Sequence, residues 1–175
     1  MSDSPANSYH FITHWSVPGR LEEVADTLRD PLDLPRWWPQ VYLSARETKA
    51  GDAQGIGRVI ALHTKGWLPY TLRWNLTVAA SRYPHGFSIT ADGDIVGRGI
   101  WTFVQNGPDV DITFDWKLRA DKPLLRWLSG LFRPAFEWNH RWAMAQGQSS
   151  LLREIDRRRS LRRREARDAG SSGVS

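Results

Sequence analysis

The chain contains no cysteine in its 175 residues. This absence excludes disulfide bonds, thiolate zinc sites, iron–sulfur clusters and a cysteine nucleophile. Long hydrophobic runs are also missing: the longest apolar window, Leu124–Phe132, contains Arg126, Ser129 and Gly130. It is much shorter than the ~20 residues that a membrane-spanning helix needs. The first fifteen residues have neither a cationic start nor a continuous apolar stretch, so we expect a cytoplasmic protein.

Motifs for metals and nucleotides are equally scarce. His10 and His14 fall in a segment expected to be a strand, and no histidine–carboxylate group has a recognisable ligand spacing. The glycine pairs at Gly55–Gly57 and Gly97–Gly99 are not followed by a helical pattern, which a phosphate-binding loop requires. We therefore expect no metal site and no cofactor.

The net charge of +5 is concentrated at one end of the chain. From Leu151 onward, eight arginines stand against four acidic residues, so this segment carries +4 and the remaining 150 residues carry only +1. The near-neutral body argues against nucleic acid as the main partner. The arginine runs 157–159 and 162–164 are either a solvated, frayed helix end or a weak contact for an anionic membrane or nucleic acid.

The remaining composition is that of one globular domain, with 41% hydrophobic and 25% charged residues. We expect residues 1–8 to form a flexible arm and residues 9–160 to form the folded domain. Residues 161–175, which include two glycines and three serines after the arginine runs, are expected to be a disordered tail.

The first third of the chain alternates between extended and helical patterns. Tyr9–Val17 is dense in aromatic and β-branched residues and predicts a strand, and Arg20–Arg29 carries apolar residues at helical spacing. Leu32–Trp38, between two prolines, predicts a short helix or turn. Val41–Glu47 and Arg58–Thr64 are again extended in character.

Between residues 70 and 120, apolar and polar residues alternate with period 2. Leu72–Val78 and Val110–Leu118 each place their apolar side chains on one face. This pattern is typical of an antiparallel sheet that is covered on one side only.

The turn after Gln105 predicts the register of the hairpin around it. With Gln105 opposite Val110, Trp101 faces Phe114 on the dry face of the sheet. Gly97 and Gly99 then either leave space beside the partner strand or mark a bulge.

Helical character begins after Pro123. Leu124–Phe132 predicts an opening segment, and Pro134 is suited to the first turn of a longer helix that runs to about Arg159. At ~100° per residue, one stripe of this helix is expected to face the sheet. That stripe comprises Phe136, His140, Ala143, Met144, Gly147, Leu151 and Ile155.

These elements predict an α+β fold in which a curved antiparallel sheet of about six to seven strands surrounds a long C-terminal helix. A curved sheet and a cylinder do not match along their whole length. We therefore expect a gap between them, lined by aromatic side chains, where a small apolar ligand could bind.

Four segments of the sequence resemble a known family. Leu68–Trp74, Asp92–Trp101, Asp115–Trp116 and Trp138–Met144, together with Gly147 and Leu151, are similar to bacterial members of the polyketide cyclase/dehydrase group. That group belongs to the START-like (SRPBCC, Bet v 1-like) superfamily. The resemblance covers roughly Tyr9–Arg158 and implies a helix-grip fold with a hydrophobic cavity. It implies relatives that bind lipids, sterols, hormones or polyketides, a minority of them enzymes, and it carries over no catalytic residue.

The candidate ligand-binding residues are aromatic, or lie on the expected cavity stripe. They are Trp37, Trp38, Tyr70, Trp74, Trp101, Phe103, Phe114, Trp116, Phe136, His140 and Met144. For His140 a structural hydrogen bond competes with ligand anchoring or proton transfer. For the sheet tryptophans, core packing competes with a partly polar pocket that would satisfy their indole N–H groups. Trp37 and Trp38 either border the cavity or cap one end of the sheet.

Trp138 and Trp142 fall opposite the cavity stripe. They are either packed under an adjacent loop or the Leu124–Phe132 segment, or they form a homodimer or membrane contact.

The sequence favours binding of a lipid- or polyketide-like hydrophobic or aromatic molecule in this cavity. The alternative is a cyclase or aromatase that uses the same cavity, so whether the protein is an enzyme stays open. A second alternative is binding of an anionic membrane or nucleic acid through the arginine-rich tail.

Overall fold

The computed structural model describes residues 8–120 and 123–171. Its strands are β1 (Ser8–Pro18), β2 (Tyr42–Lys49), β3 (Val59–Lys65), β4 (Thr71–Ser81), β5 (Gly86–Gly93), β6 (Ile95–Asn106) and β7 (Asp109–Ala120). Between β1 and β2 lie helix α1 (Leu21–Leu28), the 3-10 turn η1 (Pro31–Asp33) and the short helix α2 (Leu34–Trp37). Helix α3 spans Pro123–Ser171.

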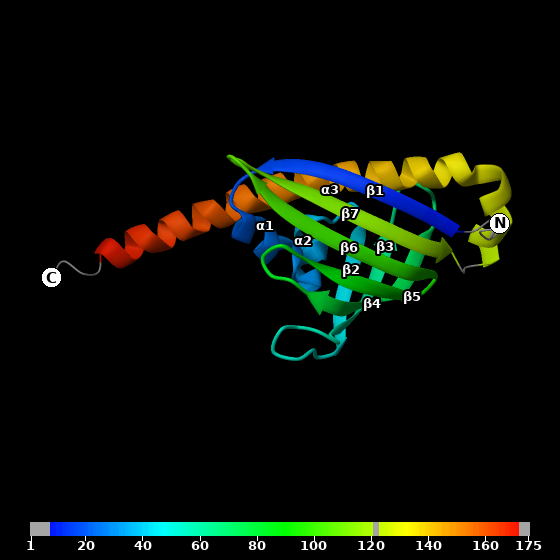
Figure 1. Ribbon diagram of the computed structural model, residues 1–175, viewed down its shortest axis with the longest axis horizontal. Coiled ribbons are helices and arrows are strands. Elements are labelled where there is room, and N and C mark those ends of the chain that lie inside the picture. Colours follow the sequence, from blue (N-terminus) through cyan, green and yellow to red (C-terminus); the bar gives the residue numbers. More distant parts are fainter. Residues whose placement is uncertain (1–7, 121–122, 172–175) are drawn as a thin grey trace.

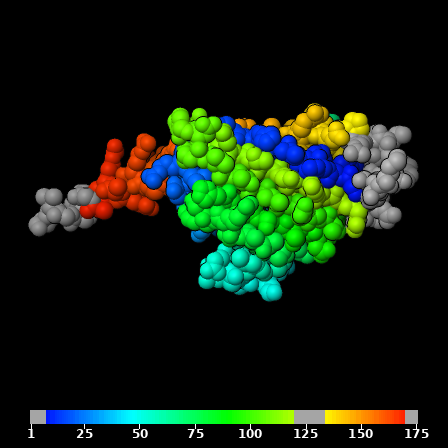
Figure 2. Space-filling model, in the orientation of Figure 1, coloured from blue at the N-terminus to red at the C-terminus, as the bar shows by residue number. Residues whose placement is uncertain are grey.

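The strands form one antiparallel sheet in the order β1-β7-β6-β5-β4-β3-β2. The sheet curves around one side of α3, and α1 and α2 lie on that same side (Figure 1). The outer face of β1, β6 and β7 is a continuous surface, and the last turns of α3 project beyond it (Figure 2). The predicted α+β architecture is confirmed.

The predicted register of the β6–β7 hairpin is also confirmed, because Gln105 pairs with Val110 and Trp101 pairs with Phe114. At Gly99, both alternatives for the glycines are wrong. The pairing runs without a register shift, which excludes a bulge there. A Cβ atom on Gly99 would lie 2.7 Å from the ring of Phe114 and 2.8 Å from that of Trp116, so aromatic rings already occupy the expected space.

Helix α3 is one element where the sequence predicted two, with Pro134 inside it. Its predicted stripe faces inward: the first four members line a cavity, Gly147 contacts Trp38, and Leu151 and Ile155 are buried in the core. Residues 161–171, which were expected to be disordered, continue the helix, because arginine, glutamate and alanine are good helix formers. Residues 1–7 and 172–175 of the predicted arm and tail lie outside the described residues.

The core lies between the sheet and the helices. Val17, Val24, Ile60, Val110 and Leu151 are all fully buried there, and they come from β1, α1, β3, β7 and α3. None of the helices in the described part of the chain is long and apolar enough to cross a membrane.

Candidate functional site

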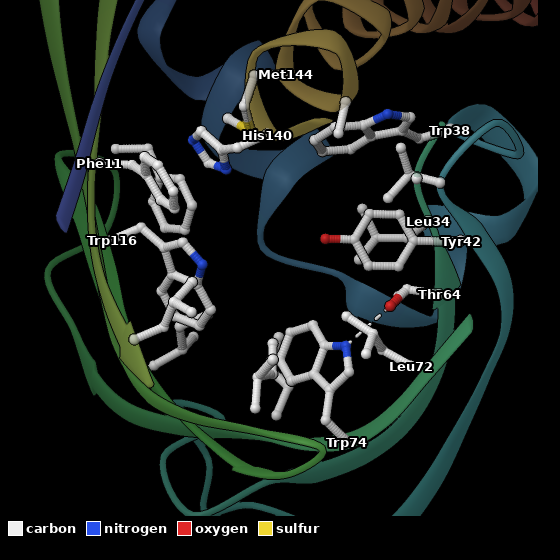
Figure 3. Close-up of a pocket in the computed structure, with 18 of the residues that line it drawn as sticks. Phe11, Leu34, Trp38, Tyr42, Thr64, Leu72, Trp74, Trp116, His140 and Met144 are labelled. Carbon is white, nitrogen blue, oxygen red and sulfur yellow. Dashed lines mark hydrogen bonds between the residues drawn. The ribbon is translucent and has the colours of Figure 1, made fainter. Parts of the chain in front are cut away.

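A cavity of about 200 Å³ lies between the concave face of the sheet, helix α3 and the segment around α2 (Figure 3). Each wall comes from a different part of the chain. Alternate residues of β1 and β3–β7 point inward, and α3 contributes one stripe. The loop after α2 contributes Trp38 and Val41, and β2 contributes its first residue, Tyr42. The hollow therefore depends on the tertiary fold and not on one local motif.

Nine of the eleven candidate residues line this cavity. They are Trp38, Tyr70, Trp74, Trp101, Phe114, Trp116, Phe136, His140 and Met144. The other two lie outside its lining: Trp37 is buried beside Trp38, and Phe103 packs against Phe87 and Trp101 in the core. Both side chains therefore belong to the core.

Several lining residues were missed by the sequence analysis, among them Tyr9, Phe11, Tyr42 and Thr64. Tyr9 and Phe11 could have been found, because period 2 in β1 places them on the inner face with buried Trp15 and Val17. No pattern in the sequence indicates Tyr42, whose direction depends on the turn between α2 and β2.

Stacked aromatic rings form one wall of the cavity. The ring centroids of Trp101 and Phe114 are 4.0 Å apart with an interplanar angle of 15°, and those of Phe114 and Trp116 are 5.5 Å apart at 21°. Trp74 lies 6.2 Å from Trp116. Such a wall presents broad ring surfaces, which suit another flat ring in offset or tilted contact.

His140 lies at the helix side of the cavity (Figure 3). Its ring stacks on Phe11 with centroids 4.1 Å apart, and its Nε2 is 3.2 Å from Oγ1 of Thr13. Its Nδ1 has no hydrogen-bond partner within residues 8–120 and 123–171. Burial lowers the pKa of His140 to about 4, so the imidazole is neutral at pH 7.

Tyr42 points its hydroxyl into the cavity from the opposite wall (Figure 3). Burial raises the pKa of Tyr42 well above its usual range, so the hydroxyl stays protonated and can donate a hydrogen bond. No group in the described part of the chain accepts that bond. The cavity therefore has neutral polar atoms on two facing walls, at His140 and Tyr42.

The indole N–H groups of Trp74 and Trp116 differ in their hydrogen bonding. The Nε1–H of Trp74 donates to Oγ1 of Thr64 over 3.1 Å, so the protein itself supplies this acceptor. The indole nitrogen of Trp116 faces the cavity (Figure 3). A polar pocket is thus unnecessary for Trp74, whereas a ligand could accept a hydrogen bond from Trp116.

Charge is nearly absent from the lining. Lys65, which is exposed, is the one charged side chain among the described lining residues. Burying an ionised group without a partner costs several kcal/mol or shifts its protonation. The lining therefore favours an uncharged ligand.

One end of the cavity is bounded by the loop between β3 and β4. Oδ1 of Asn139 on α3 accepts hydrogen bonds from the backbone N–H groups of Trp67 (2.7 Å) and Leu68 (3.2 Å). A Cβ atom on Gly66 would lie 2.1 Å from the Asn139 side chain, so any larger residue there would displace Asn139. Asn139 thereby fixes this loop to the helix.

The same loop partly covers Trp138. The rings of Trp67 and Trp138 meet edge to face at 4.4 Å, and they stay 60% and 41% exposed. Trp142 is partly buried and packs against the main core. The loop thus covers part of Trp138, and the core covers part of Trp142, while a dimer or membrane contact remains a prediction.

The lowered pKa of His140 predicts a specific pH dependence of stability. The unfolded histidine binds a proton near pH 6.5 and the folded one only near pH 4, so acidification between these values favours the unfolded state. Between pH 7 and pH 5, the wild type should lose about 2 kcal/mol of unfolding free energy relative to His140→Phe. Urea unfolding at each pH measures this difference, and parallel pH profiles of the two proteins would contradict it.

No group of three or more metal-ligating side chains is found among the described residues.

Comparison with known proteins supports the fold. The family model described as "Polyketide cyclase / dehydrase and lipid transport" matches residues 13–151. A search of curated proteins finds no match by sequence.

Three similar solved structures share the START-like helix-grip arrangement with this chain. TTHA0849 from Thermus thermophilus has a TM-score of 0.71 at 14% identity, covering 84% of this chain and 97% of that one. The Zhui aromatase/cyclase from a Streptomyces species has a TM-score of 0.64 at 16% identity, covering 86% and 95%. A START superfamily protein from Mycobacterium smegmatis has a TM-score of 0.67 at 12% identity, covering 85% and 97%. At these identities the likeness establishes the fold alone.

Proposed function

The chain belongs to the polyketide cyclase/dehydrase and lipid transport family, and we propose that it binds an uncharged, flat hydrophobic molecule in the cavity between sheet and α3. The observation that carries this proposal is the hollow itself, walled by stacked aromatic rings and almost free of charge. A dry apolar cavity of comparable size, about 150 Å³, is known to bind benzene. A hollow of about 200 Å³ suits a ligand of a few rings or a short chain.

The polar atoms of the cavity support a ligand with one or two neutral hydrogen-bonding groups. Tyr42 offers a donor, and the free Nδ1 of neutral His140 offers an acceptor or a donor, depending on its tautomer. A carbonyl facing Tyr42 and a hydroxyl facing His140 would satisfy both. Such groups are common in aromatic polyketides and in oxygenated lipids.

A second candidate function is cyclisation or aromatisation of a ligand in the same cavity. Tyr42 could donate to a substrate carbonyl while Nδ1 of His140 removes a proton from the adjacent carbon. The proton would pass to His140, and the enolate oxygen would keep the hydrogen bond from Tyr42. A general base works best with a pKa near the working pH, whereas that of His140 is lowered to about 4. The side chains of Tyr42 and His140 could thus take part in proton transfer, but the lowered pKa of His140 favours binding over catalysis.

Two fluorescent probes with one ring skeleton test the proposal. N-phenyl-1-naphthylamine is neutral, and 1-anilinonaphthalene-8-sulfonate adds a sulfonate to the same rings. The neutral probe should bind in a 1:1 ratio at micromolar concentrations, detected by energy transfer from the tryptophans. The sulfonate should bind at least about tenfold more weakly, since the lining offers its charge no buried cation. Equal or tighter binding of the sulfonate, or no binding of the neutral probe, would refute the proposal.

A further inference from the structure

Between residues 36 and 40, the segment that carries Trp38 contacts α3 at three places. Arg36 pairs with Glu154, the hydroxyl of Ser150 donates to Oε1 of Gln40 over 3.4 Å, and the indole of Trp38 packs on Gly147. The α3 residues at 147, 150 and 154 are spaced by three and four positions and so share one helix face. One face of α3 therefore positions the whole α2 segment.

Glu154 is the centre of the charged contact. Its side chain is 2% exposed, and its two oxygens accept five hydrogen bonds from three arginines. Arg36 donates over 2.8 and 2.9 Å, Arg157 over 2.8 and 2.9 Å, and Arg158 over 2.6 Å. These bonds hold the pKa of Glu154 far below its usual range.

Asp33 ties the same arginines to the start of the α2 segment. It accepts hydrogen bonds from Arg36 over 2.8 and 3.3 Å and from Arg158 over 2.9 Å. We call Asp33, Arg36, Glu154, Arg157 and Arg158 together the ion-pair clamp. It links a four-residue helix, which has little stability of its own, to the longest helix of the protein.

The contact between Trp38 and Gly147 leaves no room for a side chain. A Cβ atom at position 147 would lie 2.3 Å from Cζ2 of the indole. Trp38 also meets Tyr42 edge to face at 5.2 Å, and both residues line the cavity. Any shift of the α2 segment relative to α3 therefore moves this cavity wall.

We propose that the ion-pair clamp and the glycine at position 147 determine the size of ligand that the cavity accepts, because together they fix the position of Trp38 in the cavity wall. This inference rests on the proposed binding function. The other main walls are strands within a continuous hydrogen-bonded ladder, so enlarging the cavity there would break backbone pairing. Tyr42 belongs to β2 and pairs with Thr64 of β3, whereas the segment up to Trp38 is held to α3 mainly by side chains. Trp38 is therefore the adjustable part of this wall. At about 200 Å³ the hollow is smaller than the 300–1,000 Å³ usual for drug-sized ligands, so the position of this wall decides what fits.

The test compares two neutral dyes of different size, N-phenyl-1-naphthylamine and the larger Nile red. In Arg36→Gln, the ratio of the affinity for Nile red to the affinity for the smaller dye should rise at least about tenfold. The reason is that Glu154 no longer holds the segment that carries Trp38. Glu154 keeps its bonds to Arg157 and Arg158 in this variant, so the fold should persist. Arg164→Gln removes an equal charge from an exposed site further along α3 and should leave the ratio unchanged.

Gly147→Ala provides an independent variant with the opposite effect. Its methyl group should push Trp38 toward the cavity and lower the affinity ratio, because the affinity for Nile red falls more than that for the smaller dye. An unchanged ratio in both Arg36→Gln and Gly147→Ala would overturn the inference while leaving the proposed function intact. Failure of the wild type to bind either dye would overturn both.

Discussion

Replacing Ala143 with tryptophan is expected to weaken binding of N-phenyl-1-naphthylamine at least 100-fold while the protein stays folded. Ala143 lies on α3 and lines the cavity, so an indole at this position would occupy the space that a ligand needs. Filling a hollow adds apolar contacts, so the unfolding free energy should stay level or rise. Fluorescence titration measures the affinity, and urea unfolding confirms the fold.

The matched control is Ala145→Trp, two residues further along the same helix. Ala145 is exposed, so the new indole there should leave dye affinity within about twofold of the wild type. If Ala143→Trp binds the dye as tightly as Ala145→Trp does, the dye is bound elsewhere on the protein.

The second large effect concerns the charged core of the ion-pair clamp. Glu154→Gln should lower the free energy of unfolding by about 3 kcal/mol, the lower end of the range for removing one partner of a buried ion pair. The lower end applies because Arg36 and Arg157 are themselves 41% and 48% exposed, so water can hydrate their guanidinium groups once the carboxylate is gone. Urea unfolding at pH 7 measures the loss, and Glu165→Gln, at an exposed position on α3, is the control with no expected effect.

Lowering the pH should reduce the difference in unfolding free energy between the wild type and Glu154→Gln. The folded-state pKa of Glu154 lies below the value of 4.5 for the free side chain, so its stabilisation is fully present above that pH. It is lost as pH falls toward the folded-state pKa. Two results would show that the clamp does not stabilise the fold: a difference in unfolding free energy below about 1 kcal/mol at pH 7, or a difference that grows as the pH falls below 4.5.

The sheet was largely predictable from the sequence, because its strands obey a local rule. Period 2 between residues 70 and 120 indicated the strands and their inner faces, and the turn after Gln105 indicated the β6–β7 register. The helical stripe from Phe136 to Ile155 was predictable for the same reason, since a period of 3.6 fixes one face. Seven of the nine candidate residues in the cavity lining lie there because the inner face of the sheet and the stripe of α3 face each other, whereas Trp38 and Tyr70 come from loops.

The link between the clamp and the α2 segment could not be predicted, because Asp33 and Arg36 are far in the sequence from Glu154 and Arg158. The spacing of Glu154 to Arg157 and Arg158 permits local helix pairs, but nothing local shows that Asp33 and Glu23 also hold the arginines at 157–159. Glu23, whose pKa is lowered to about 2 mainly by its hydrogen bonds with Arg159, joins α1 to the same helix. Much of the arginine-rich segment thus packs the N-terminal helices against α3.

The position of Tyr42 could not be predicted from the sequence for a related reason. Neither its residue type nor its spacing indicates the inner wall, because a turn of irregular backbone separates it from α2. Its place depends on the pairing of β2 with β3 and on its edge-to-face contact with Trp38, which packs on α3. Side chains positioned by such chains of tertiary contacts leave no periodic signal in the sequence.

Diffraction from a crystal of the unliganded protein under xenon pressure tests the central claim most directly. Xenon enters dry apolar cavities and needs no knowledge of the natural ligand. The account predicts a xenon peak between Trp74, Trp116 and Met144, with the surrounding side chains in place. The absence of xenon from that position, with these side chains packed against one another, would contradict it.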